Sequence, residues 1–446
     1  MDQLWDVTYA TQPSGLVVPK HARRNTPKYE WKIGQQPPSL GDHSGAKHDI
    51  FDQYLDVYIE RLTRMPSQEM LNLTIVDGFC GGGIYRRGKA TVDGSPLRLL
   101  QIVEAADRRL NAARSKGFRI KADFFFIDQN PDHTAFLTDA LHKRGYGSRI
   151  GEDVFVVTGR FDETSDRVIS HIKRKGTAHR SIWMLDQYGW SDVPFGTIRS
   201  ILGELRNPEI LLTFAVDSLI NFLSENSAVA KALLNVELTR EDVRDLIAFK
   251  DDAGWRYLIQ NGLYRHIQAQ TRAQFYTPFF IRSRESNRAY WLLHLSNHRQ
   301  ARDEMGKLHW ALTNRFEHHG GAGFHALGFD PRVDLRQNLL AFMFDDDAMT
   351  RSESAVLTQL PDLLRQASSA GVSLEVEGVF AGHCNDTPVT SDIVNRSLLL
   401  LRDEGELEIA SRDGAVKPRA RTVRWDDRII LPAERSLFSV LGAQRW

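Results

Sequence analysis

Cysteine is nearly absent from this sequence, which contains only Cys80 and Cys384 in 446 residues. Two thiols cannot build a disulfide framework, and they are too few for a zinc site of the usual kind. Small disulfide-bonded and zinc-dependent domains are therefore excluded, and we expect no metal. So little cysteine is typical of a reducing compartment, and we expect the protein in the cytoplasm.

Net charge and long apolar runs are absent as well. Lysine plus arginine equals aspartate plus glutamate at 57 each, so only a local patch can argue for a polyanionic partner. The longest apolar run, 210–223, is interrupted by Asp217 and Asn221 and is too short to span a bilayer. The amino terminus lacks the basic start and apolar core of a secretory signal. We expect no membrane partner.

The length of the chain predicts two or three domains. Residues 1–40 are polar, contain five prolines and show no sustained period, so they predict an extended arm. An α/β domain is expected at 41–312. Glycines and histidines at 313–335 break the pattern and predict a linker, after which 336–446 is expected to fold independently as a smaller α+β domain.

A glycine-rich turn follows a short apolar stretch at 73–83, which reads LTIVDGFCGGG. Leu73, Ile75 and Val76 have the composition of a buried strand, which ends in Asp77. The four glycines that follow allow positive φ and close approach of backbone N–H groups to a ligand. The spacing is neither the dinucleotide fingerprint nor a phosphate loop. An acid followed by Phe-Cys-Gly instead resembles the first motif of class I S-adenosylmethionine (SAM) methyltransferases; the alternative is a plain tight turn.

Further apolar stretches predict the rest of a doubly wound sheet. They lie at 122–128, 153–159, 181–186 and 210–216, with a final antiparallel pair at 277–282 and 290–296 and a helical insert at about 217–275. Three of the strands end in an acid, at Asp77, Asp128 and Asp186. Because ligands bind outside the carboxyl ends of such strands, these acids are expected to meet at one edge.

Resemblance to the SAM-binding motif gives each of these positions an expected role. The glycine turn would contact the cofactor through Asp77, Gly78, Phe79, Gly81 and Gly83. Asp128 would accept hydrogen bonds from the ribose hydroxyls, or would simply be a polar strand end. After the third strand, Phe161 would stack on the adenine ring and Asp162 would accept from its amine, an assignment that depends on position alone.

The C-terminal region has the outline of a winged helix. Thr390 is an expected N-cap, and the apolar stripe that follows predicts a helix ending at Gly405. Strands at 407–409 and 422–430 would pair across a basic loop. Nucleic acid is one partner for such a domain, through Lys417, Arg419 and Arg421, and a protein partner is the alternative.

Several stretches taken together resemble a bacterial family, the three-Cys-motif partner proteins (TcmP-like). The matching pieces are HSGAKHDIFDQYLDVY, VDGFCGGG with the later GSPL, FFFIDQN, MLDQYGW and YWLLHLSNHRQARDEMGKLHW, followed by the winged-helix-like tail. The resemblance spans most of 41–446. It implies a Rossmann-like class I SAM methyltransferase fold whose substrate is not settled.

The fourth-strand motif departs from that family and leaves two hypotheses open. Gln187 stands where the family form has proline, and Tyr188 lies two residues after Asp186 rather than three as in amino-group methyltransferases. The first hypothesis is a SAM-dependent methyltransferase in which Asp186 and Tyr188 orient the acceptor, with few other catalytic groups required. The second is a non-catalytic SAM- or nucleotide-binding protein whose tail binds nucleic acid or a protein.

Overall fold

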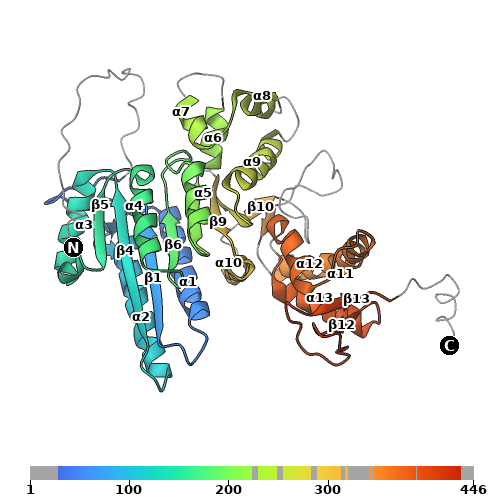
Figure 1. Cartoon of the computed structure of the whole chain (residues 1–446). Coiled ribbons are helices and arrows are strands. Elements are labelled where there is room, and N and C mark those ends of the chain that lie inside the picture. The colour runs from blue at the N-terminus through green and yellow to red at the C-terminus, as the bar shows by residue number, and fades with distance from the viewer. Residues whose placement is uncertain are drawn as a thin grey trace.

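The computed structural model describes residues 29–223, 230–248, 255–282, 289–312, 317–319, 341–343, 346–387 and 389–432. A seven-stranded sheet forms the centre of the larger domain (Figure 1). Its order is β5 (Val154–Thr158), β4 (Arg119–Asp128), β1 (Met70–Asp77), β6 (Arg180–Leu185), β7 (Glu209–Phe214), β9 (Ala289–Ser296) and β8 (Phe275–Arg282). Within this sheet β9 runs opposite to the other six strands and is therefore antiparallel to both β7 and β8. The mixed α/β fold with a mostly parallel sheet is confirmed.

Alternating side chains of the central strands supply two hydrophobic cores. Phe124 and Phe126 of β4 face one core, whereas Phe125 and Ile127 face the other, as the two-residue period of a strand requires. The first core is covered by helices α1 (Asp42–Leu62), α2 (Ser95–Ala113), α3 (Pro131–Lys143) and α10 (Arg299–Ala311). The second is covered by α4 (Phe161–Arg174), α5 (Phe195–Glu204) and α9 (Trp255–Thr271). Burial on both faces explains why these strands are nearly continuous apolar runs.

Two insertions interrupt the alternation of strands and helices. A hairpin of β2 (Ile84–Arg87) and β3 (Ala90–Asp93) lies between the glycine turn and α2. Between β7 and β8 the described residues form α6 (Val216–Phe222), α7 (Ala230–Asn235), α8 (Arg240–Ala248) and then α9. Figure 1 places α6, α7 and α8 beyond the carboxyl end of the parallel strands, whereas α9 returns beside the sheet, where it covers the second core. No helix among the described ranges is long and apolar enough to cross a membrane.

The C-terminal unit packs beside α10 (Figure 1). It contains α11 (Asp346–Ser369), α12 (Val376–His383), η4 (Cys384–Asp386), α13 (Ser391–Asp403) and a pair formed by β12 (Glu408–Ala410) and β13 (Arg428–Ile430). Most of the expected linker lies outside the described residues, but β10 (Glu317–His319) falls in it and pairs with β11 (Ala341–Met343).

One hydrophobic core continues from the sheet domain into the C-terminal unit. Met305 and Leu308 of α10 belong to the same buried cluster as Val389 and Ile393 at the start of α13. The two parts of the chain therefore share an apolar interface, and independent folding of 336–446 stays a prediction.

The second strand of the wing is shorter than the sequence predicts. The expected strand at 422–430 is reduced to Arg428–Ile430. The buried Asp427 carboxylate accepts the backbone N–H of Arg424 at 2.9 Å and pairs with Lys417 at 2.5 Å, which folds the preceding residues into a turn. A side chain that captures its own backbone competes with ladder hydrogen bonds.

Candidate functional site

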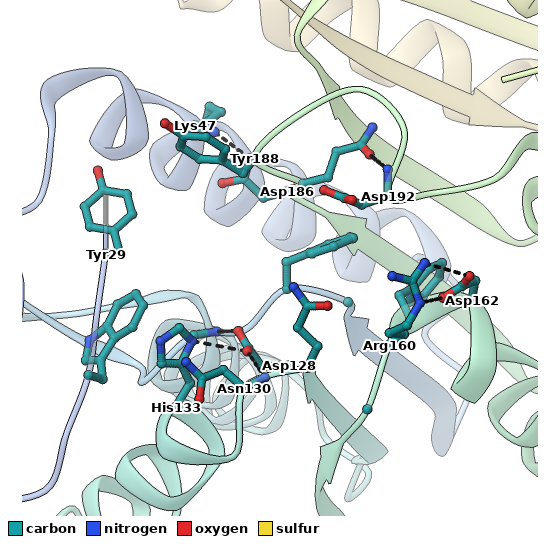
Figure 2. A pocket seen from close by; sticks show the side chains of 18 of the residues that line it. Tyr29, Lys47, Asp128, Asn130, His133, Arg160, Asp162, Asp186, Tyr188 and Asp192 are labelled. Atoms are coloured by element: carbon teal, nitrogen blue, oxygen red, sulfur yellow. Dashed lines mark hydrogen bonds and ion pairs between the residues drawn. The ribbon is translucent and has the colours of Figure 1, made fainter. Parts of the chain in front are cut away.

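A cavity of about 510 Å³ opens at the carboxyl ends of β1, β4, β5 and β6 (Figure 2). Its volume falls in the range of small-molecule sites, roughly 300–1,000 Å³. Among the predicted site residues, those that line it are Gly78, Phe79, Gly81, Asp128, Phe161, Asp162, Asp186 and Tyr188. Asp77 and Gly83 are not among its lining residues. The carboxyl ends of these strands therefore lie at one edge of the sheet, and two of the three acids, Asp128 and Asp186, line the cavity there.

The glycine turn is shaped by packing as much as by any ligand. Gly81 and Gly83 have φ angles of 57° and 73°, in the region that favours glycine. A Cβ at Gly82 would lie 2.3 Å from Cγ of Trp31, and one at Gly83 would lie 2.5 Å from Leu137. A Cβ at Gly81 would lie 2.7 Å from Trp31, and one at Gly78 would lie 2.7 Å from Leu185. Protein neighbours therefore require glycine at all four positions, and Gly78 and Gly81 are the two that also line the cavity.

Trp31 belongs to the segment that the sequence predicts to be an extended polar arm. The described part of that arm, 29–40, instead joins the site: Trp31 is only 3% exposed, and its indole N–H donates to the carbonyl of Ile84. Its ring lies against Tyr85, with 5.2 Å between centroids, and against His133, at 4.9 Å. Figure 2 shows Tyr29 at the same end of the cavity. The aromatic side chains of Tyr29 and Trp31, close together near the end of the arm, were the available signal.

Asp77 ends β1 beneath the turn and is 2% exposed. One carboxylate oxygen accepts the Phe79 N–H at 3.2 Å. Burial raises the pKa of Asp77 to about 7, although Ser95 and the Phe79 N–H act in the opposite direction. The carboxyl group therefore supports the turn from below and titrates near neutral pH.

Asp77 is expected to make the folded protein less stable as the pH rises from about 4 to about 7. In that window the unfolded chain has lost the Asp77 proton while the folded chain retains it, so stability is complete below the window and reduced above it. A difference of about 3 pKa units corresponds to at most about 4 kcal/mol. Asp77→Asn should remove this loss, measured as urea midpoints across the pH series. The exposed Asp132→Asn is the control, and parallel curves for wild type and Asp77→Asn would contradict the expectation.

Asp128 ends β4 and is held by three protein donors. Oδ1 accepts the Asn130 N–H at 2.8 Å and His133 Nδ1 at 3.1 Å, and Oδ2 accepts the Gly81 N–H at 3.1 Å. A carboxylate oxygen can accept two hydrogen bonds, so Oδ2 retains capacity for one hydroxyl group. This arrangement fits one ribose hydroxyl, and it ties the acid of the second strand to the glycine turn of the first.

The residues expected to hold adenine are more constrained than the sequence suggests. Phe161 is 3% exposed, and a Cβ at Gly78 would lie 2.8 Å from its ring, so it packs beneath the turn rather than standing free. Both oxygens of Asp162 are bound by Arg160, at 3.0 and 2.9 Å, as Figure 2 shows. The adenine role of this pair stays a prediction.

Asp186 forms an ion pair that the sequence did not reveal. Its Oδ1 lies 2.5 Å from Nζ of Lys47, which comes from α1, and the two side chains are 24% and 9% exposed. Burial opposes ionisation, but the charge and hydrogen bond of Lys47 outweigh it and hold the pKa of Asp186 below its ordinary value. The Lys47 ammonium also lies 6.0 Å from the ring centroid of Tyr290. A lysine at the start of the helix that precedes the first strand was the only signal.

Gln187 holds the loop after β6 in place through its side chain, at the position where a rigid proline was expected. It is 1% exposed, and its Oε1 accepts the backbone N–H groups of Asp192 at 2.9 Å and Val193 at 3.1 Å. This side chain therefore closes the loop that follows β6. Tyr188, the next residue, is 64% exposed and lines the same cavity as Lys47 and Asp186. The loop presents an aromatic ring at the mouth of the cavity.

The basic side chains of the loop between β12 and β13 have different surroundings. Lys417 is bound to the buried Asp427 and stabilises the loop itself. Arg419 and Arg421 are exposed. Among the described residues no group of three histidine, cysteine or acidic side chains could hold a metal ion.

Comparisons with known proteins concern both halves of the chain. Residues 328–414 match the family model described as "GMT-like wHTH domain". This unit is a winged helix. No curated protein matches the chain in sequence.

Three solved structures resemble the chain at low similarity. A protein from Legionella pneumophila str. Philadelphia 1 has a TM-score of 0.34 and 9% identity, over 60% of this chain and 90% of its own. A candidate sarcosine dimethylglycine methyltransferase from Galdieria sulphuraria has a TM-score of 0.22 and 9% identity, over 55% of this chain and 86% of its own. A geranyl diphosphate methyltransferase in complex with SAM has a TM-score of 0.22 and 9% identity, over 55% and 85%.

Proposed function

We propose that this protein is a SAM-dependent methyltransferase of the class I type, related to the TcmP-like proteins. The observation that carries the proposal is the sheet edge: β1 and β4 end in an acid, Asp186 directly follows β6, and the glycine turn lines one cavity together with Asp128 and Asp186. A single antiparallel strand, β9, between β7 and β8 matches the terminal pair expected of that class.

The residues around the cavity have distinct roles in this proposal. Gly78 and Gly81 allow the backbone to approach the cofactor, and Asp128 Oδ2 accepts one ribose hydroxyl. Bound SAM supplies an electrophilic methyl group on a sulfonium. Asp186, held by Lys47, and the exposed ring of Tyr188 orient the acceptor so that its nucleophile lies in line with the methyl group. The acceptor is not defined by these groups, and the winged helix favours a nucleic acid.

A non-catalytic SAM or nucleotide sensor is the second candidate. It is favoured by the ion pair of Asp186, because a carboxylate already bound by Lys47 is less available to an incoming amine. Transfer of a labelled methyl group to DNA, RNA or cell protein distinguishes the two candidates. Binding of SAM without any transfer would favour the sensor.

Wild-type protein is expected to bind S-adenosylhomocysteine, measured by calorimetry. Asp128→Asn should weaken this binding by about tenfold or more, because a hydrogen bond to a charged acceptor contributes roughly 1.5–3 kcal/mol. The control is Gly88→Ala, which strains a positive φ of 62° in the hairpin but meets no neighbour within 4 Å. No heat with the wild type, or equal affinity for wild type and Asp128→Asn, would contradict the proposed cofactor site.

A further inference from the structure

The first turn of α13 is buried against the sheet domain. The backbone N–H and the hydroxyl of Ser391 donate to the two oxygens of Asp303, at 2.7 and 2.6 Å. Asp303 belongs to α10 and is fully buried. Its carboxylate satisfies donors at the N-terminus of α13 and complements the helix dipole there. In helix-turn-helix proteins, this end of the recognition helix contacts base edges in the major groove.

Further charged contacts fix the same junction. The buried guanidinium of Arg302 donates to the carbonyls of Thr387 and, at 3.1 Å, Val389. Lys307 bridges Asp303 at 3.0 Å and Asp392 of α13 at 3.2 Å. Breaking a buried network of this kind leaves unpaired charges, which is strongly unfavourable. The approach to DNA normally used by this helix is therefore occupied by the chain itself.

The solvent-exposed side of α13 is also poorly suited to phosphates. Arg396 is paired with Glu353, and Arg402 is paired with Asp403 and donates to the carbonyl of Ala420. Asp392 adds an exposed negative charge in the first turn. Both arginines of the helix are thus engaged within the winged helix.

The wing offers a different surface. Arg412, Arg419, Arg421 and Arg424 are exposed, and none of them forms an ion pair within the described part of the chain. Only Asp413 and Asp426 are exposed acids at the tip, since Asp427 is buried with Lys417. Four unpaired guanidinium groups on one loop are well matched to successive phosphates of a nucleic acid backbone.

We infer that α13 is a docking helix that holds the winged helix on the sheet domain, and that nucleic acid is bound at the wing through its phosphates, without base readout. This inference rests on the nucleic-acid partner proposed above. Phosphate contacts position a protein on a strand but carry no sequence information, so binding is independent of sequence. DNA and RNA share this chemistry.

Anisotropy titrations of the full chain test the inference with two DNA duplexes of equal length and unrelated sequence and one RNA duplex. Affinities for the two DNA duplexes should agree within about twofold and fall steeply with salt. The double variant Arg419→Ala/Arg421→Ala should lose about two phosphate contacts, so the slope of log affinity against log salt concentration should become shallower by about two. The control Arg396→Ala, on the exposed side of α13, should leave both quantities unchanged.

Three results would overturn the inference. They are a tenfold or larger preference for one DNA sequence, a loss with Arg396→Ala equal to that of the wing variant, and no salt-dependent binding to any duplex. A binding difference between DNA and RNA would identify which source of phosphate fits the wing. Calorimetry with S-adenosylhomocysteine on the same preparations is independent of these results, so failure at the wing is distinguishable from failure of the methyltransferase proposal.

Discussion

Asp186→Ala should destabilise the folded protein by about 3 kcal/mol, because it leaves the ammonium of Lys47 buried without its partner. The sequence predicts a role for Asp186 in orienting the acceptor, and the ion pair adds a role in stability. Lys47→Met combined with Asp186→Ala should recover most of the loss, since an apolar pair removes the uncompensated charge. Urea unfolding of the single and double variants measures the coupling.

Methyl transfer separates the stability of this pair from its role in orientation. The double variant should fold and bind S-adenosylhomocysteine, yet transfer no methyl group to whichever acceptor the wild type uses. Asp192→Ala is the control, because it removes a second acid that lines the same cavity but lies outside the pair with Lys47. Equal stability of the single and double variants, or full transfer by the double variant, would contradict the assigned roles.

Asp303→Ala should cost about 3–5 kcal/mol, since it removes a fully buried carboxylate that binds the start of α13 and pairs with Lys307. Its control is Asp392→Ala: that carboxylate binds the same lysine but is 54% exposed, so its loss should cost less than about 1 kcal/mol. Urea unfolding gives the free energies, and limited proteolysis shows whether the winged helix is released. Similar losses for both variants would mean that Asp303 does not anchor the junction.

The positions of the strands could be predicted from the sequence, whereas their order in the sheet and much of the cavity could not. Buried parallel strands leave long apolar runs, so β1, β4, β6 and β7 were visible as stretches of sequence. Asp77 and Asp128, which end β1 and β4, and Asp186, which follows β6, were predicted from their positions alone. A pairing such as Lys47 with Asp186 joins residues 139 apart, and no local period records it.

Three departures have the same physical origin, which is that one side chain replaced a feature expected of the backbone. The amide of Gln187 closes the loop at the position where a proline was expected. The indole of Trp31 fills the space beside the glycine turn that was expected to hold a ligand. The carboxylate of Asp427 ends a strand early. Such contacts depend on tertiary neighbours, which a single sequence does not display.

The two cysteines divide between the two parts of the chain, and both are buried. Cys80 lies in the glycine turn and is 2% exposed, and Cys384 follows α12 in the winged helix and is 1% exposed. Burial also raises the pKa of the Cys80 thiol, so it is protonated and inert in the folded state. Each thiol can react with an alkylating reagent only when its own surroundings open. The alkylation rate of each cysteine therefore reports how often its own part of the chain opens. Equal rates for Cys80 and Cys384 would mean that the sheet domain and the winged helix open as one cooperative unit.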